Sequence, residues 1–212
     1  MFNEELPDHV VYSPPVIDFV TVVAETCLFL ENASEGGRDE FIDKSVKILP
    51  LLYLKTSLLK VPEPVFGDGA ERFVMEEDYL FVKEQMEQLL GVDDTYLEVF
   101  HPDMALSDTP IAAFVSENMA DIYQELKDFA ANYQTADTDV MNDALVVCLE
   151  AFAEHWGQKL LNALRALHAL RYSDSFGEEE TEAPQGAKLD RNAFLGFLHD
   201  DEAKNEYGKL LD

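Results

Sequence analysis

The residues best suited to chemistry lie in one long helical pattern in the C-terminal half of the chain. His155, Trp156 and Gly157 stand together, and Arg165 and His168 follow at a spacing of three residues. At about 100° per residue, Arg165 and His168 share one helix face, whereas His155 lies about 220° away from His168. A basic pair on one face is suited to a carboxylate or phosphate. Alternatively, basic residues near a helix C-terminus interact with its negative end and with acidic neighbours.

The preceding helical pattern contributes Asp121 and Tyr123. If the two helices pack side by side, these side chains would form a cleft that holds an acid/base pair and an anion clamp. For Trp156 the competing interpretation is simple packing of a large ring in the core. The candidate ligand-binding residues are therefore Asp121, Tyr123, His155, Trp156, Arg165 and His168.

Sequence motifs for catalysis and for metal or cofactor binding are absent. The chain has no phosphate-binding glycine loop, no dinucleotide fingerprint and no Gly-x-Ser-x-Gly elbow. No glutamate is followed by a histidine three residues later, as a di-iron helical bundle requires, and no Cys/His pair has zinc spacing. We therefore expect no metal and no cofactor, and the sequence favours a non-catalytic protein over an enzyme.

Hydrophobic periodicity predicts an all-α protein, a single helical domain over residues 1–212. Apolar residues recur at spacings of three and four in five main segments. The expected helices cover about 14–33, 41–59, 76–90, 110–129 and 140–171, with a short final helix at about 191–199. The first half of the segment 140–171 has almost no polar face, which is typical of a central helix surrounded by the others.

Several local features interrupt this pattern. Pro50 falls inside the second helix and should kink or split it. Residues 96–100 are either extended or one helical turn, since periodicity cannot distinguish these two conformations in so short a segment. Asp137-Thr138-Asp139 lacks the glycine and glutamate of a calcium loop and is expected to cap the fifth helix. Residues 173–188 are rich in glutamate and are expected to form an acidic flexible loop.

The charge of the chain is strongly negative and unevenly distributed. The net charge is −28, and residues 61–140 alone carry 3 basic and 19 acidic groups, which is −16. Such a surface repels nucleic-acid phosphates and anionic lipids, so direct binding to either is excluded as a main role. The natural partner is a basic protein, although an acidic surface also serves solubility alone.

Features that bear on location favour the cytoplasm. No apolar run reaches the roughly 18 residues that span a bilayer, and the N-terminal residues are acidic rather than basic. Cys27 and Cys148 each sit in an apolar helical pattern and are expected to be buried hydrophobic residues rather than a disulfide.

Five segments in order resemble a bacterial family of small helical proteins classed as a domain of unknown function. They are LPLLY (49–53), EDY (77–79), DTYLEVF (94–100), ADIYQEL (120–126) and HWG with NALRALH (155–168). The resemblance covers about residues 16–171 and implies a cytoplasmic, all-helical protein, but no activity, substrate or cofactor. It also draws attention to Asp78, Tyr79 and Tyr96 as second-rank candidates.

Three functions remain open at this point. The first is a non-catalytic protein that binds a basic macromolecule through its acidic 61–140 surface. The second is a small-molecule or anion site, enzymatic or not, between the fourth and fifth helices around Arg165 and His168. The third is an acidic mimic of a nucleic-acid surface that blocks a basic enzyme. The sequence does not reveal the oligomeric state.

Overall fold

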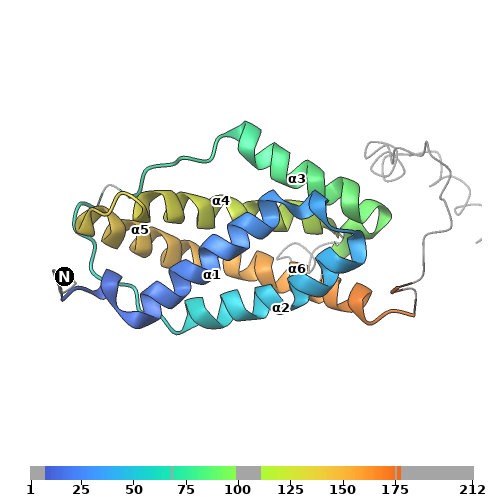
Figure 1. Cartoon of the computed structure of the whole chain (residues 1–212), viewed down its shortest axis with the longest axis horizontal. Helices are drawn as coiled ribbons and strands as arrows, with labels where there is room; N and C mark the ends of the chain where they lie inside the picture. The colour runs from blue at the N-terminus through green and yellow to red at the C-terminus, as the bar shows by residue number, and fades with distance from the viewer. Residues whose placement is uncertain (1–7, 68, 99–110, 175, 178–212) are drawn as a thin grey trace, which may run out of the picture. The chain divides into compact units, whose positions relative to one another are not determined.

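The computed structural model describes residues 8–67, 69–98, 111–174 and 176–177, in which six α-helices and one antiparallel pair of short strands are joined by short helical turns and loops (Figure 1). These residues belong to one unit, Met1–Gly177. The helices are α1 (Pro14–Glu31), α2 (Arg38–Ser57), α3 (Glu76–Leu90), α4 (Val115–Tyr133), α5 (Thr138–Ala151) and α6 (Gly157–Arg171). The predicted all-α class is confirmed. The predicted loop 173–188 lies largely, and the helix 191–199 entirely, outside the described residues.

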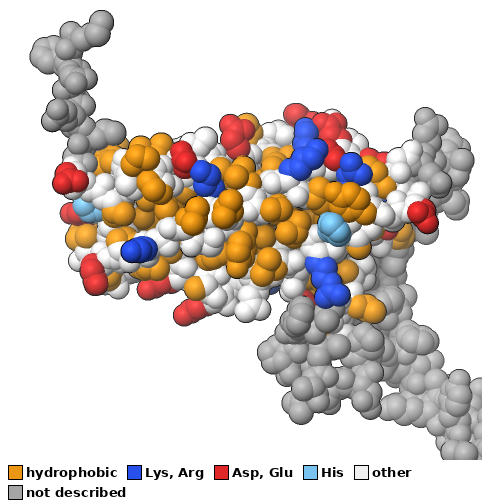
Figure 2. Space-filling model, turned by 90° about the horizontal axis from the view of Figure 1, so that it is seen from below, with side chains coloured by type: hydrophobic (Ala, Val, Ile, Leu, Met, Phe, Trp, Pro, Cys, Tyr) orange, Lys and Arg blue, Asp and Glu red, His pale blue; other side chains and the backbone are white. Residues whose placement is uncertain are grey.

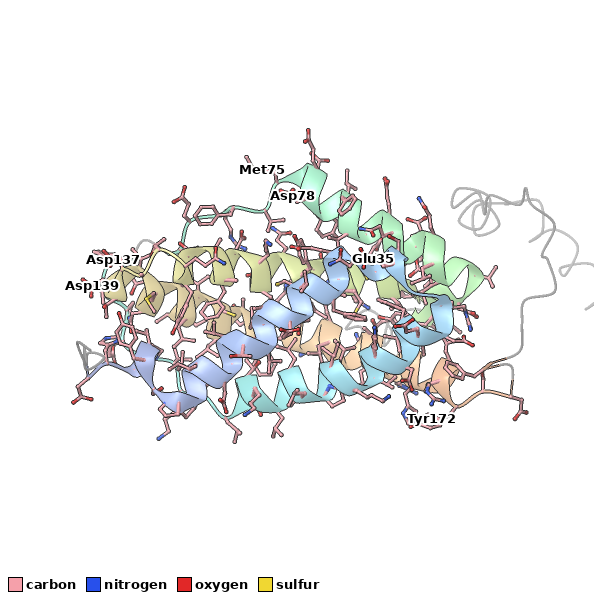
Figure 3. All side chains as sticks on the ribbon, viewed as in Figure 1. Glu35, Met75, Asp78, Asp137, Asp139 and Tyr172 are labelled. Atoms are coloured by element: carbon pink, nitrogen blue, oxygen red, sulfur yellow. The ribbon has the colours of Figure 1, made fainter. Side chains whose placement is uncertain are left out.

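Local signals account for the helix ends that were predicted well. Helix α1 begins with prolines at its first two positions, where no backbone N–H is needed. Helix α3 spans the predicted 76–90 and ends at Gly91, whose φ of 55° suits glycine. Asp137 accepts hydrogen bonds from the N–H groups of Asp139 and Val140 and so caps α5, as expected (Figure 3). These interactions all join residues close in sequence.

Helix α2 continues through Pro50 as one element, so the proline does not split it. Pro50 lies on the exposed side of the helix. Its ring therefore does not disturb the buried side of the helix, and Leu49 and Leu52 stay in the core.

The segment before α4 differs from the prediction. Thr95–Glu98 (β1) pairs antiparallel with Ile111–Phe114 (β2), so residues 95–98 are extended and the helix begins at Val115, not near residue 110. The Asp94 carboxylate, which is buried, accepts hydrogen bonds of 2.7 Å from both the backbone N–H and the hydroxyl of Ser116. A side chain from outside the helix thus satisfies an N–H of its first turn.

Helix α4, rather than the predicted segment 140–171, is the centre of the bundle. It packs against α1, α3, α5 and α6, and eleven of its 19 residues are buried. Helix α5 is mostly buried as expected, but α6 buries only Gly157, Leu160, Ala163 and Leu167. The prediction of a central 140–171 helix is therefore wrong. The second half of that segment is polar, and only one side of the helix is buried there.

The segment 140–171 is also not a single regular helix. A π-helical turn, Phe152–Trp156, separates α5 from α6. The N–H of Gly157 donates to the carbonyl of Phe152, five residues earlier. The wider turn changes the direction in which later side chains point, and it leaves His155 exposed while Trp156 is fully buried.

Buried aspartates hold the long connection between α2 and α3. Asp143 accepts hydrogen bonds from the N–H groups of Val65 (2.6 Å) and Phe66 (2.7 Å). Asp128 likewise accepts from the N–H groups of Phe73 and Val74. The connection therefore lies along α4 and α5 and is part of the fold, not a boundary between domains (Figure 1).

Candidate functional site

The basic pair of the predicted cleft lies on the outer face of α6. Arg165 and His168 are both exposed, and the ring of His168 packs against Tyr172 with centroids 4.6 Å apart. Trp156 is buried, and its Nε1–H donates to the carbonyl of Cys148 at 3.0 Å, as the packing interpretation requires. These three side chains do not meet at one place.

The acidic and phenolic candidates lie elsewhere and form separate contacts. Asp121 accepts a hydrogen bond from the Tyr79 hydroxyl (3.0 Å) and pairs with Lys159 of α6 (2.5 Å). The Tyr96 hydroxyl accepts a hydrogen bond from Asn118. Asp121 and Tyr79, predicted separately, thus come together, and with Lys159 they link three helices.

Tyr123 belongs to a third group. Its hydroxyl donates to Glu31 Oε1 at 2.9 Å, and Lys127 Nζ donates to the same oxygen at 2.6 Å. Burial, followed by the hydrogen bond to Glu31, raises the pKa of Tyr123 above the usual range. The hydrogen bond to Glu31 also raises the pKa of Lys127. The structure thus does not bring Tyr123 together with Arg165 in a cleft between α4 and α5.

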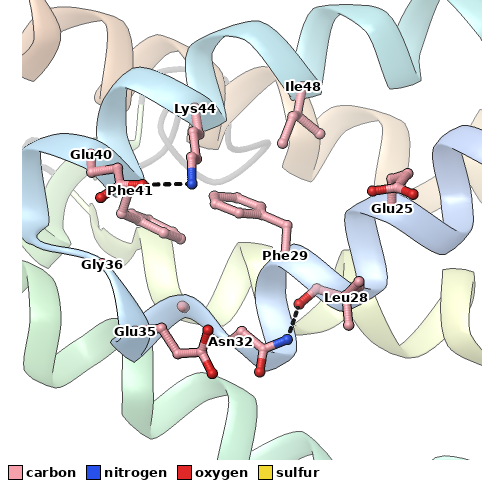
Figure 4. A pocket seen from close by; sticks show the side chains of 11 residues that line it. Glu25, Leu28, Phe29, Asn32, Glu35, Gly36, Glu40, Phe41, Lys44 and Ile48 are labelled. Atoms are coloured by element: carbon pink, nitrogen blue, oxygen red, sulfur yellow. Dashed lines mark hydrogen bonds and ion pairs between the residues drawn. The ribbon is translucent and has the colours of Figure 1, made fainter.

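A pocket of about 580 Å³ between α1 and α2 was not predicted from the sequence (Figure 4). The half-buried ring of Phe29 stacks on the buried ring of Phe41, with centroids 5.3 Å apart and an interplanar angle of 14°. Three carboxylates and one lysine provide its charged lining: Glu25, Glu35, Glu40 and Lys44. Because only one cation faces three carboxylates, the pocket is suited to a positively charged group.

The carboxylates of this pocket differ in whether they are paired. Glu40 pairs with Lys44 at 2.6 Å one turn along α2. Glu25 and Glu35 are exposed and have no ion pair within the described residues. Aromatic faces and carboxylates together are the groups that bind an arginine or lysine side chain.

A second pocket, of about 450 Å³, adjoins the first at the end of α1, since Asn32 lines both. It contains the Tyr123, Lys127 and Glu31 group, together with Asp78 of α3. Acidic side chains therefore extend from α2 across the end of α1 to α3. Of the sequence-predicted candidates, Tyr123 and Asp78 are the two brought together here.

Comparison with known proteins identifies the family. The model of a domain of unknown function (DUF5063) matches residues 10–173. The chain belongs to this family. The crystal structure of protein BF1032 from Bacteroides fragilis is similar, with 42% identity and a TM-score of 0.70 over 78% of this chain and 97% of that one. The comparison with curated proteins found no match.

In this DUF5063 domain, four carboxylates of residues 61–140 make contacts that serve the fold itself. Asp94 and Asp128 are buried and accept backbone hydrogen bonds, and Asp78 accepts from the N–H of Met75 at the start of α3 (Figure 3). Glu125 pairs with Arg72. These four carboxylates are engaged within the fold, and binding through the acidic 61–140 surface stays a prediction. Within the residues that are described, no group of three or more possible metal ligands occurs, and no helix is long and apolar enough to cross a membrane.

The two cysteines of the DUF5063 domain are free and buried, as predicted. Burial raises the pKa of Cys27 to about 12 and also raises that of Cys148. Because a thiolate is the reactive form, we expect neither to react with a disulfide reagent in the native protein at pH 7.5, and both to react in urea. The test is the absorbance of the chromophore that the disulfide reagent releases, measured before and after unfolding. Rapid reaction of either thiol in the native protein would contradict the prediction.

Proposed function

We propose that this protein is a non-catalytic helical module that binds a basic segment of another protein. The observation that carries the proposal is the pocket between α1 and α2, in which a stacked aromatic pair is combined with an excess of carboxylates. An arginine side chain can stack on the exposed part of the Phe29 ring and donate to carboxylates in the same place. The acidic second pocket, which shares Asn32, extends the surface available to such a segment.

Electrostatics favour the same class of partner. A chain with a net charge of −28 attracts basic surfaces at long range and repels nucleic acid and anionic membranes. The exposed Glu25 and Glu35 keep their charges available to a partner. The proposal also includes a cytoplasmic location, with which the two free cysteines are compatible.

The test compares two triple variants with the same loss of charge. One variant carries Glu25→Gln, Glu35→Gln and Glu40→Gln in the pocket. The control carries Glu76→Gln, Glu77→Gln and Glu84→Gln on the exposed face of α3. The Kd of a fluorescein-labelled octa-arginine peptide is measured for each by fluorescence anisotropy at 150 mM salt.

We expect the pocket variant to weaken peptide binding at least about tenfold and the control less than about threefold, because the long-range charge effect is the same in both. Equal weakening by the two variants would mean generic attraction and would contradict the proposal, as would a wild-type protein that does not bind the peptide. Captures from lysate with the wild type and both variants then identify basic proteins that depend on the pocket.

A further inference from the structure

One side of the molecule differs in charge from the rest. Residues 44–57 of α2 and residues 157–171, which form α6, contain no aspartate or glutamate, although the chain as a whole is strongly acidic. Figure 2, which shows the molecule from below, has hydrophobic side chains gathered along the middle and acidic ones at the margins. The exposed hydrophobic residues of these two segments include Leu51, Leu54 and Leu161, and Leu58, directly after α2, is exposed as well.

Most basic residues of these two segments form ion pairs with carboxylates that lie outside the segments, in the first turns of α2 or on α1 and α4. The pairs are Lys44–Glu40, Lys47–Asp43, Lys55–Asp18, Lys159–Asp121 and Arg171–Asp43. Arg165 differs, since within the described part of the chain it has no ion pair. An exposed guanidinium without a carboxylate partner is unexpected in a protein with 43 acidic and 15 basic residues.

Arg165 lies at a pocket of about 460 Å³ between α2 and α6. Its apolar lining comes from Tyr53 of α2, Phe152 of the π-helical turn and Leu161 of α6. The polar lining comes from Arg165, Asn162 and Gln158 of α6, at spacings of three and four that place them on one side of the helix. No carboxylate is among the lining residues of this pocket.

The π-helical turn is a second, independent indication of function at this pocket. Phe152 and Ala153 of the turn, and Gly157 directly after it, line the space. Turns of this kind are rare and occur frequently at functional sites, because they point side chains in directions that a regular helix does not allow. The ring of Phe152 packs against the rings of Tyr53 and Trp156, with centroid distances of 5.2 Å and 4.6 Å. These contacts fix the position of the Phe152 ring at the edge of the pocket.

We propose that the groove between α2 and α6 binds a small amphipathic anion. The apolar body lies against Tyr53, Phe152 and Leu161, and the carboxylate or phosphate head accepts hydrogen bonds from the Arg165 guanidinium. The pocket volume is in the range of small-molecule sites. In the pocket between α1 and α2, the carboxylates of Glu25, Glu35 and Glu40 would repel such an anion. This site is separate from the proposed basic-partner site and does not depend on it.

A smaller pocket, of about 180 Å³, shares Arg165 and Asn162 with the first and is also lined by Glu98 of β1. The Glu98 carboxylate accepts hydrogen bonds from Asn162 (3.0 Å) and from the Tyr96 hydroxyl (3.4 Å). These bonds keep the carboxylate engaged with β1 and α6. The anion is therefore expected in the larger pocket beside Tyr53 of α2, which no carboxylate lines.

The test uses three ligands with the same eight-carbon chain: octanoate, octyl phosphate and uncharged 1-octanol. Binding is measured by calorimetry and by the fluorescence of Trp156, the single tryptophan, whose ring lies against Phe152. We expect the wild type to bind at least one of the anions about tenfold or more tightly than octanol, because of the charge-assisted contact. The anion that binds more tightly identifies the head group.

Arg165→Gln should remove the preference for the anion while leaving octanol binding within about twofold. Arg171→Gln is the matched control, because it removes the same charge from the same helix but at a residue already paired with Asp43; it should keep the preference. Thermal unfolding of each variant checks that it is folded. Equal binding of anion and octanol, an unchanged preference in Arg165→Gln, or no binding of either anion would overturn the proposal.

Discussion

Replacing Gly157 with alanine is expected to lower the free energy of unfolding by about 2–4 kcal/mol. A Cβ at this position would lie 2.4 Å from the carbonyl oxygen of Phe152 and 3.0 Å from two of its ring carbons. The oxygen belongs to the backbone of the π-helical turn, so it cannot rotate away as a side chain would. The φ of Gly157 is −62°, so the cost is steric and does not come from an unusual backbone angle.

Urea unfolding followed by circular dichroism measures this effect. Gly37→Ala is the control, because no atom lies within 4 Å of a Cβ there and the backbone is extended at φ −78°; we expect a change below about 1 kcal/mol. If the free energy of unfolding of Gly157→Ala lies within about 0.5 kcal/mol of the wild-type value, the turn rearranges without cost and the prediction is wrong. The emission of Trp156 then reports whether its ring remains buried.

Replacing Asp143 with asparagine is expected to lower the free energy of unfolding by about 2–4 kcal/mol at pH 7. The carboxylate is buried, and its two oxygens accept from the N–H groups of Val65 and Phe66. An asparagine retains one accepting oxygen and puts an amide donor where the other stood. One backbone N–H of the connection then loses its partner.

The effect should depend on pH in a defined direction. Burial disfavours the charged form of Asp143, but the backbone hydrogen bonds outweigh it, and the pKa of Asp143 lies below its ordinary value. A lowered native pKa adds stability that is present above the ordinary carboxyl pKa of about 4 and is lost as the pH falls through the native value. The difference between wild type and variant should therefore shrink on acidification.

Unfolding curves between pH 7 and pH 3 test this, together with hydrogen exchange at Val65 and Phe66, which should become faster. The control is Asp139→Asn, an exposed residue in the first turn of α5, with an expected change below about 0.5 kcal/mol. A difference between wild type and Asp143→Asn that stays constant with pH would contradict the assigned role of the carboxylate.

The prediction from sequence succeeded where neighbouring residues decide the structure. The start of α1 at Pro14, the end of α3 at Gly91 and the cap of α5 at Asp137 all depend on residues within one turn. It failed at the start of α4, where the Asp94 carboxylate accepts a hydrogen bond from the N–H of Ser116, 22 residues further along the chain. It also missed the π-helical turn, since the apolar spacing on both sides of it is that of an ordinary helix.

The candidate site was only partly predictable for the same reason. Tyr123 and Asp78 were singled out and lie at one pocket, but their neighbours Glu31 and Lys127 were not recognised. Nothing in the spacing of residues along α1 or along α2 indicated that Phe29 of one helix would stack on Phe41 of the other. Arg165 was recognised as an unusual cation, yet the groove beside it depends on α2, which the sequence did not place next to α6.

The sequence by itself determined the helical class, the Asp137 cap of α5, the burial of both cysteines and the family, because hydrogen bonding within a helix and hydrophobic spacing are local properties. The tertiary structure alone decided which helix is central, which aspartates are buried and which side chains share a pocket. Those outcomes depend on which helix faces meet. Many pairings bury similar apolar area, and only packing of the complete set of side chains distinguishes among them.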